Sequence, residues 1–232
     1  MQIEVLENAD AVAERAAAVI ADEARNAVAA RGRFVMAVSG GHTPWLMLRA
    51  LANEDVPWND MHLMQVDERV APPEHPDRNL THLRASLLSR APLRPDHVHA
   101  MPVESRDLRA AAGHYSETLV EIAGSPPILD LVHLGLGPDG HTASLVPGDP
   151  VLAVMDRDVA LTGNYQGRHR MTLTYPMINR SRRILWVVTK EDKAPTLARL
   201  RKADRSIPAG RVDQERGQLL ADRAAASKLP AD

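Results

Sequence analysis

The sequence of 232 residues contains no cysteine. Disulfide bridges, thiolate nucleophiles and zinc sites built on cysteine are therefore excluded. Aromatic residues make up only 3% of the chain, which is too few for a surface on which nucleic-acid bases could stack. The net charge is also small, −2 at pH 7, so we expect no overall attraction to nucleic acid or to an anionic membrane.

Long apolar runs are missing too. The most strongly apolar stretches, such as ILWVV at 184–188, are far too short to span a bilayer. The opening MQIEVLENAD has neither the basic start nor the apolar core of a signal peptide. These features predict a cytoplasmic soluble protein without a nucleic-acid or membrane partner. The chain length favours a single α/β domain over residues 1–232, with room for a small lobe within 150–185.

What the sequence does contain is an alternation of apolar runs and amphipathic segments. Residues 9–30 carry apolar side chains at helical spacing, and Gly32 is placed to end that helix. The run FVMAV at 34–38 is typical of a strand buried on both faces. Strands separated by helices predict a mostly parallel sheet with helices on both faces.

The other predicted elements follow the same alternation. We expect further strands at 62–66, 97–101, 128–136, 158–163, 170–175 and 183–188. We expect further helices at 45–51, 79–88, 106–123 and 194–202, the second of them capped by Asp77 or Asn79. Residues 205–217 are predicted to form a surface loop, and the C-terminal segment a short strand or helix followed by a final helix.

Three polar loops follow strands of the predicted sheet, at the edge where ligands bind in such folds. These loops are SGGHTP at 39–44, DERVAPPEHPDRN at 67–79 and GLGPDGHTAS at 135–144. They therefore contain the candidate functional residues.

The glycines of GLGPDGHTAS have the spacing of a dinucleotide-binding fingerprint. That fingerprint needs a helix directly after its third glycine to hold the pyrophosphate, but only HTASLV separates Gly140 from the helix-breaking PGDP. Asp139 would also repel the pyrophosphate, so we reject a nicotinamide cofactor. The glycines instead suit a sharp turn that presents His141 as a general base beside a carboxylate that fixes its tautomer. From these residues alone, a plain solvated turn is an equally good interpretation.

The loop SGGHTP has the features of an anion site. Gly40 and Gly41 allow the backbone to curl around an anion, and the helix that follows adds unpaired N–H groups and its dipole. Ser39 and Thr43 add hydroxyls, and Thr43 is placed to cap the helix, with Pro44 at its first position. No P-loop lysine is present, so a phosphate monoester fits better than a nucleoside triphosphate. An ordinary strand-to-helix turn is the alternative.

Charged residues at other strand ends complete the candidate set. Asp67 and Arg69 stand at the end of an apolar strand, and Arg170 and Lys193 could each supply a cation for phosphate. Taken singly, the latter two are typical of surface charges. The alternating histidines in HVHA at 97–100 have no third ligand and no H-E-x-x-H pattern, so we expect loop histidines and no metal site.

Taken together, the loops resemble the motifs of the 6-phosphogluconolactonase family, which is related to the glucosamine-6-phosphate deaminases. The resemblance spans most of the chain and is carried by SGGHTP, DERVAPPEHPDRN, LGLGPDGHTASLVPG, RMTLTYPMIN and VTKEDKA. Two positions depart from the family pattern. Val146 replaces a usual Phe, and Arg78 stands where a Ser usually precedes Asn79.

The resemblance implies a Rossmann-like sheet and the hydrolysis of 6-phospho-D-glucono-1,5-lactone to 6-phosphogluconate, the second step of the oxidative pentose phosphate pathway. It also implies that no metal or other cofactor is needed. His141 matches the family's catalytic base, with Asp139 placed to orient it, and Asp67 and Arg69 match the residues beside the reacting ring. The sugar-phosphate-binding residues implied are Ser39, Gly40, Gly41, Thr43, Arg170 and Lys193.

Two other functions stay open from the sequence. Glucosamine-6-phosphate deaminases carry a Glu five residues after the matching His, where this chain has the apolar Val146. The first of these functions is that deaminase activity. The second is a non-catalytic sugar-phosphate-binding module, although the base and the cations of an enzyme are present. The sequence leaves open whether Arg69 serves an oxyanion or the phosphate, and whether the protein is a monomer or a small homo-oligomer.

Overall fold

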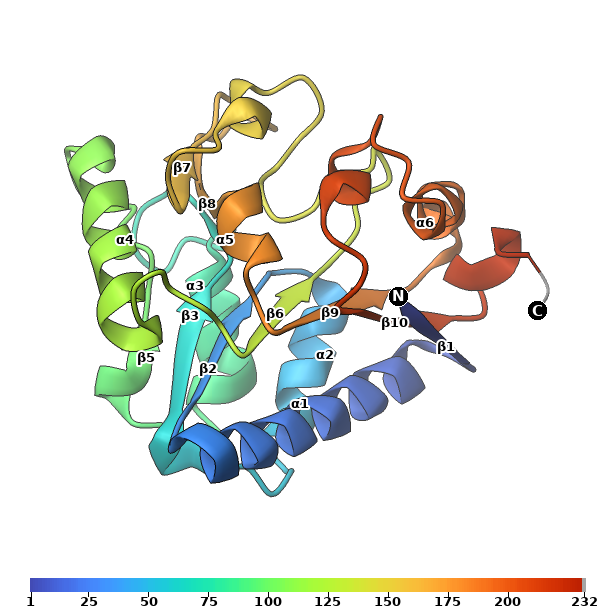
Figure 1. Cartoon of the computed structure of the whole chain (residues 1–232), viewed down its shortest axis with the longest axis horizontal. Coiled ribbons are helices and arrows are strands. Elements are labelled where there is room, and N and C mark those ends of the chain that lie inside the picture. The colour runs from blue at the N-terminus through green and yellow to red at the C-terminus, as the bar shows by residue number, and fades with distance from the viewer. Residues whose placement is uncertain (231–232) are drawn as a thin grey trace.

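The computed structural model describes residues 1–230, and a twisted parallel sheet runs through its centre (Figure 1). Within the described residues this sheet has seven strands, and every neighbouring pair in it is parallel. In spatial order the strands are β1 (Gln2–Leu6), β10 (Gly217–Asp222), β9 (Arg183–Val188), β6 (Leu131–Leu134), β2 (Phe34–Val38), β3 (Met61–Gln65) and β5 (Val98–His99).

Helices cover both faces of this sheet, which confirms the predicted fold class (Figure 1). One face carries α1 (Ala9–Arg31), α2 (His42–Leu51) and α3 (Asn79–Leu83). The other face carries α4 (Leu108–Ala123), α5 (Tyr175–Asn179) and α6 (Ala194–Arg201). The long helix α1 begins where the Asn8 side chain accepts the N–H of Ala11, and it ends at Gly32, whose φ of 73° suits glycine.

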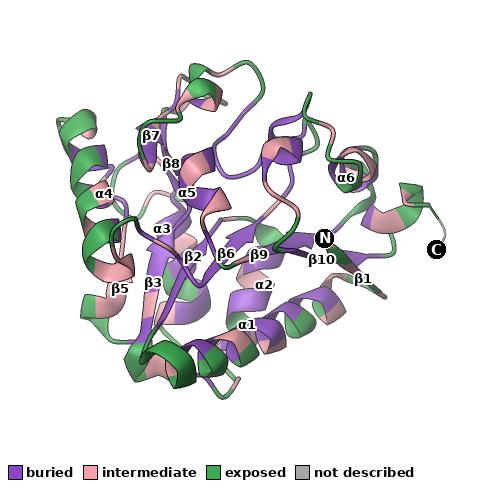
Figure 2. Ribbon diagram, in the orientation of Figure 1, coloured by how far each residue is buried: buried purple, intermediate pink, exposed green. Residues whose placement is uncertain are grey.

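The central strands are buried on both sides because their side chains alternate between two hydrophobic cores. In β2, Val35 and Ala37 join the core under α4, α5 and α6, whereas Phe34, Met36 and Val38 join the core under α1 and α2. Figure 2 shows the strands buried and the outer surfaces of the helices exposed.

A second, antiparallel sheet lies beyond the carboxyl end of β3. Within residues 1–230 it consists of three short strands in the order β4 (Asp67–Arg69), β8 (Arg170–Leu173) and β7 (Val159–Leu161). The predicted neighbouring strands at 158–163 and 170–175 correspond to β7 and β8. The segment DER, predicted as a loop, is instead a strand. It escaped prediction because it has three charged residues and pairs only with a segment about 100 residues away. The division into one domain and a lobe stays a prediction.

Several other predicted bounds need correction. The edge strand β1 was not expected. The C-terminal segment begins with the strand β10, one of the two predicted alternatives, and up to residue 230 it continues with a 3₁₀ turn at Ala225–Lys228 in place of the predicted final helix. The predicted helix 79–88 is α3 followed by a π-helical turn at Arg84–Leu88. The predicted loop 205–217 is not wholly at the surface, because Ile207 and Ala209 are buried in a 3₁₀ turn region.

Shorter 3₁₀ turns connect the main elements. They lie at Trp58–Asp60, Pro95–His97, Pro150–Ala153, Glu191–Lys193 and Pro208–Arg211. No helix within residues 1–230 is both long enough and apolar enough to cross a membrane.

Candidate active site

A pocket of about 310 Å³ opens at the carboxyl ends of β9, β6, β2 and β3, which are neighbours in the sheet. The loops that follow these strands converge there, as expected for an open α/β sheet. Nine of the ten predicted site residues line the pocket: Ser39, Gly40, Gly41, Thr43, Asp67, Arg69, His141, Arg170 and Lys193. The tenth, Asp139, contacts the pocket through His141.

Asp139 and His141 form a hydrogen-bonded pair in the turn after β6. The Asp139 Oδ1 atom lies 2.6 Å from His141 Nδ1 and 3.1 Å from the His141 backbone nitrogen. The hydrogen bond to His141 holds the pKa of the Asp139 carboxyl well below its usual range. An ionised carboxylate accepts the Nδ1 proton, which leaves Nε2 as the basic nitrogen of His141.

Two glycines of this turn leave no room for a side chain, and Gly137 is the one that makes space for the pair. A Cβ atom at Gly137 would lie 2.1 Å from His141 Nδ1 and 2.6 Å from Asp139 Oδ1. At Gly140, φ is 86° and a Cβ atom would lie 2.6 Å from the Cβ of Ile207. The spacing that looked like a cofactor fingerprint therefore encloses a carboxylate–imidazole pair.

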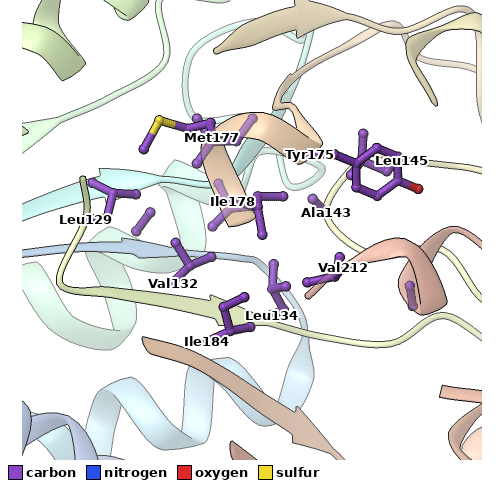
Figure 3. Close-up of a cluster of buried hydrophobic side chains, with 14 of the residues drawn as sticks. Leu129, Val132, Leu134, Ala143, Leu145, Tyr175, Met177, Ile178, Ile184 and Val212 are labelled. Atoms are coloured by element: carbon purple, nitrogen blue, oxygen red, sulfur yellow. The ribbon is translucent and has the colours of Figure 1, made fainter. Parts of the chain in front are cut away.

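The segment after His141 is anchored in the core. Ala143 and Leu145 are buried and belong to the same cluster as Tyr175 and Ile178, between β6 and α5 (Figure 3). The imidazole is thus carried on a turn that is fixed at both ends, by β6 and by this cluster.

Tyr165, which the sequence analysis did not select, braces the pair from the turn between β7 and β8. Its hydroxyl donates to Asp139 Oδ2 over 2.9 Å, and its ring meets the His141 imidazole edge-on at 5.6 Å between centroids. The guanidinium carbon of Arg170 lies 4.8 Å from the centre of the same ring. The only sequence signal is a lone aromatic residue in a turn between Gly163 and Gly167.

The antiparallel sheet places two arginines side by side. Arg69 on β4 pairs directly with Arg170 on β8. Burial first, and the charge of Arg69 second, lower the pKa of the Arg170 guanidinium. Asp67, on the same strand as Arg69, is buried, and its Oδ2 accepts the Ser144 hydroxyl over 2.7 Å. Two neighbouring cations favour the binding of an anion at this position.

Buried Glu68 holds this strand in place. Its carboxylate accepts the backbone N–H groups of Asn79 and Leu80, each over 2.8 Å, so it caps α3 from eleven residues upstream. The prediction that Asp77 or Asn79 caps this helix is therefore wrong. A carboxylate in that position supplies both the acceptor and the favourable charge that a cap provides.

Arg78 neutralises Glu68 inside the protein. Its Nε lies 3.2 Å from Glu68 Oε2, and its Nη1 donates to Glu104 Oε1 over 2.9 Å and to the Ala71 carbonyl over 3.1 Å. Only 2% of Arg78 is exposed. Arg78, which stands where the family usually has Ser, is therefore a buried cation that closes the loop after β4.

The loop SGGHTP is fitted to its neighbours at the start of α2. The Ser39 N–H donates to His133 Nδ1 over 3.3 Å, and the Ser39 hydroxyl donates to the His133 carbonyl over 3.1 Å. A Cβ atom at Gly40 would lie 1.9 Å from Asn79 Oδ1, so only glycine fits between the two loops. Asn79 also lines the pocket, although the sequence analysis considered it only as a helix cap.

Thr43 does not cap α2 as predicted. The helix begins at His42 because Gly41, with φ of 133°, turns the chain one residue before it. The Thr43 hydroxyl instead lies 2.5 Å from that of Thr189, which joins the start of α2 to the end of β9. Beyond Thr189, Lys193 lines the pocket and pairs with Asp192 over 3.0 Å.

The predicted loop histidines are partly buried at the edge of the sheet. The rings of His62 and His97 stack at 4.0 Å, and His62 Nδ1 lies 3.1 Å from His99 Nε2. Across residues 1–230, no group of three or more His, Asp or Glu side chains is arranged to hold a metal ion.

The chain is similar to known proteins over nearly its whole length. A family model for glucosamine-6-phosphate isomerases/6-phosphogluconolactonase matches residues 7–221. The chain belongs to this family. It is 36% identical over 235 residues to a 6-phosphogluconolactonase of Nostoc sp., and the match covers 98% of each chain.

Solved structures of the isomerase/lactonase family share the fold. A 6-phosphogluconolactonase from Thermotoga maritima is 26% identical, with a TM-score of 0.84 over 95% of this chain and 98% of that one. A monomeric glucosamine-6-phosphate deaminase reaches the same TM-score at 19% identity, covering 98% of this chain and all of that one. The fold is therefore common to both activities, and the residues of the pocket have to distinguish them.

Proposed function

We propose that this protein hydrolyses 6-phospho-D-glucono-1,5-lactone to 6-phosphogluconate. The observation that carries the proposal is His141, held by Asp139 within a pocket that also contains paired arginines and the N-terminus of α2. The similarity to the lactonase of Nostoc sp. over nearly the full chain supports the same substrate.

The reacting end of the pocket would work by general base catalysis. His141 Nε2 takes a proton from water as the water oxygen attacks C1 of the lactone, and Asp139 stabilises the imidazolium that forms. The tetrahedral oxyanion at C1 then collapses, the bond from C1 to the ring oxygen breaks, and the ring oxygen takes the proton from His141. Positive charge and backbone N–H groups near C1 lower the barrier by stabilising the oxyanion.

The other end of the pocket would hold the phosphate. The loop from Ser39 to Thr43 offers backbone N–H groups at the start of α2, and Lys193 adds a cation. Binding at this remote end positions C1 against His141, so binding energy contributes to the rate of the reaction.

The roles of Arg69 and Arg170 can be distinguished by comparing a phosphorylated with an unphosphorylated substrate. Arg170 is a predicted phosphate ligand, but it also stacks on Tyr165 next to the base. Arg69→Gln and Arg170→Gln are each assayed with the phosphorylated lactone and with glucono-1,5-lactone. An arginine that serves the phosphate affects only the first substrate, whereas an arginine that serves the oxyanion affects both.

The function is tested in a coupled assay in which glucose-6-phosphate dehydrogenase makes the lactone and its loss is timed. We expect His141→Asn to lower kcat by roughly 10²–10⁴-fold, the usual contribution of a general base. The matched control is His114→Asn, because His114 is an exposed histidine on α4. A His141→Asn variant with wild-type activity above spontaneous hydrolysis would contradict the assignment of the base.

The deaminase alternative fails on one position. Val146 occupies the place of the deaminases' glutamate, and it is apolar and buried. Ammonia release from glucosamine 6-phosphate would establish that activity instead. Binding of sugar phosphates without turnover would establish a non-catalytic module. The cytoplasmic location and a monomeric or small oligomeric state stay predictions.

A further inference from the structure

Lys190, directly after β9, has an unusual backbone. Its φ is 81° and its ψ is 146°, a combination that a residue with a side chain rarely adopts. Strain of this kind persists only where the surrounding structure imposes it, and it is concentrated at functional sites.

The carboxylate of Asp222 imposes this backbone. The Lys190 N–H donates to both Asp222 oxygens, each over 3.1 Å. Asp222 ends β10, is 7% exposed, and also accepts the Ala225 N–H over 2.7 Å. The backbone of Lys190, and with it the position of its Cβ atom, is thus held by the end of β10.

Lys190 lies at the predicted phosphate end of the pocket. Lys190 lines the pocket together with Lys193, three residues later. The residue before it, Thr189, contacts Thr43 of α2 through their hydroxyls. Within residues 1–230, no ion pair or hydrogen bond engages the Lys190 ammonium group, whereas Lys193 is paired with Asp192.

We propose that Lys190 binds the phosphate of the substrate and strengthens the preference for phosphorylated over unphosphorylated lactones. The proposal rests on the proposed function for the identity of the substrate. The strained backbone is retained because it places an unpaired cation in the pocket that the loop from Ser39 to Thr43 also lines, where a dianion would be attracted.

Lys190→Gly separates the effect of the strained backbone from the effect of the cation, because glycine adopts the same backbone without strain but carries no charge. We expect its thermal unfolding midpoint to rise. We expect KM for 6-phosphogluconolactone to rise about five- to tenfold, the value of one charged contact at an accessible site, with kcat unchanged. With glucono-1,5-lactone, kcat/KM should not change.

Two further variants serve as controls. Lys190→Arg keeps the cation and should keep KM near the wild-type value. Lys202→Gln removes an exposed lysine outside the pocket and should have no effect on KM, which shows that net charge is not responsible. The KM difference between Lys190→Gly and wild type should also shrink as ionic strength rises.

A stabilised Lys190→Gly variant with unchanged KM would overturn the proposal. Calorimetric binding of 6-phosphogluconate to the same proteins separates this failure from failure of the proposed function. If wild type shows no lactonase activity but binds 6-phosphogluconate more tightly than Lys190→Gly, the lactonase function fails and the role of Lys190 stands. If all of these proteins bind it equally, the role of Lys190 fails.

Discussion

The two ends of the pocket are built in different ways. At the reacting end, the Asp139–His141 pair is braced by Tyr165, and the neighbouring strand is held by the buried Glu68–Arg78 pair. At the proposed phosphate end, the available donors are a loop backbone and lysines on an accessible turn. Proton transfer needs an imidazole in one orientation and one tautomer, whereas phosphate oxygens accept hydrogen bonds from many directions. Rigid side chains therefore serve the first task, and adaptable donors suffice for the second.

The largest effect should come from removing the charge that orients the base. Asp139→Asn keeps the size of the side chain, but its amide can donate to Nδ1 and thus favours the wrong tautomer of His141. We expect kcat to fall by roughly 10²–10⁴-fold, while KM changes little because the phosphate end is intact. Steady-state kinetics of the purified variant give both values. A rise in KM with kcat preserved would place Asp139 at the phosphate end instead, and would contradict the proposed difference between the two ends of the pocket.

The next effect should appear in stability. Arg78→Met leaves the carboxylate of Glu68 buried without its cation, which typically costs about 3–5 kcal/mol of unfolding free energy. Urea denaturation followed by circular dichroism measures the loss. The control is Arg84→Met, because Arg84 is an exposed arginine a few residues further along the chain. Equal stability of the two variants would mean that the reacting end does not depend on the buried pair.

The last effect is absent at pH 7 and grows only in acid, and it arises beneath the proposed phosphate end. Burial lowers the pKa of His133 to about 3 from 6.5, so between these pH values the unfolded chain binds a proton that the folded chain does not. The free energy of unfolding therefore falls as the pH drops from 6.5, and this loss is complete near pH 3. In His133→Asn, the amide oxygen can still accept the Ser39 N–H. The free energy of unfolding of this variant should therefore fall less steeply with decreasing pH than that of wild type, by up to about 1.4 kcal/mol per pH unit.

Denaturation midpoints measured across this pH range test the prediction. His114→Asn, at an exposed position, should retain the wild-type slope. Parallel curves for wild type and His133→Asn would show that His133 carries no proton-linked stability.

Local patterns in the sequence predicted those parts of the fold that local physics determines. The strands β2 and β9 match their apolar runs residue for residue, and α1 ends at the predicted glycine. Most of the candidate residues lie together in one pocket because they directly follow strands of one parallel sheet.

Contacts between distant segments account for what the sequence did not predict. The strand β4 exists only through its pairing with β8, and α3 takes its cap from Glu68 rather than from a neighbouring residue. Tyr165 reaches Asp139 from the antiparallel sheet, whose position no periodicity in the chain reveals. The same holds for Lys190, because its backbone is set by Asp222 on another strand.

The pairing of Arg69 with Arg170 has a consequence for the lifetime of the protein. Only the folded chain brings the two guanidinium groups together, so an anion that binds between them stabilises the folded state and not the unfolded one. At about 100 times its dissociation constant, such a ligand adds about 2.7 kcal/mol. An anionic ligand held there would therefore slow any degradation that proceeds through the unfolded chain.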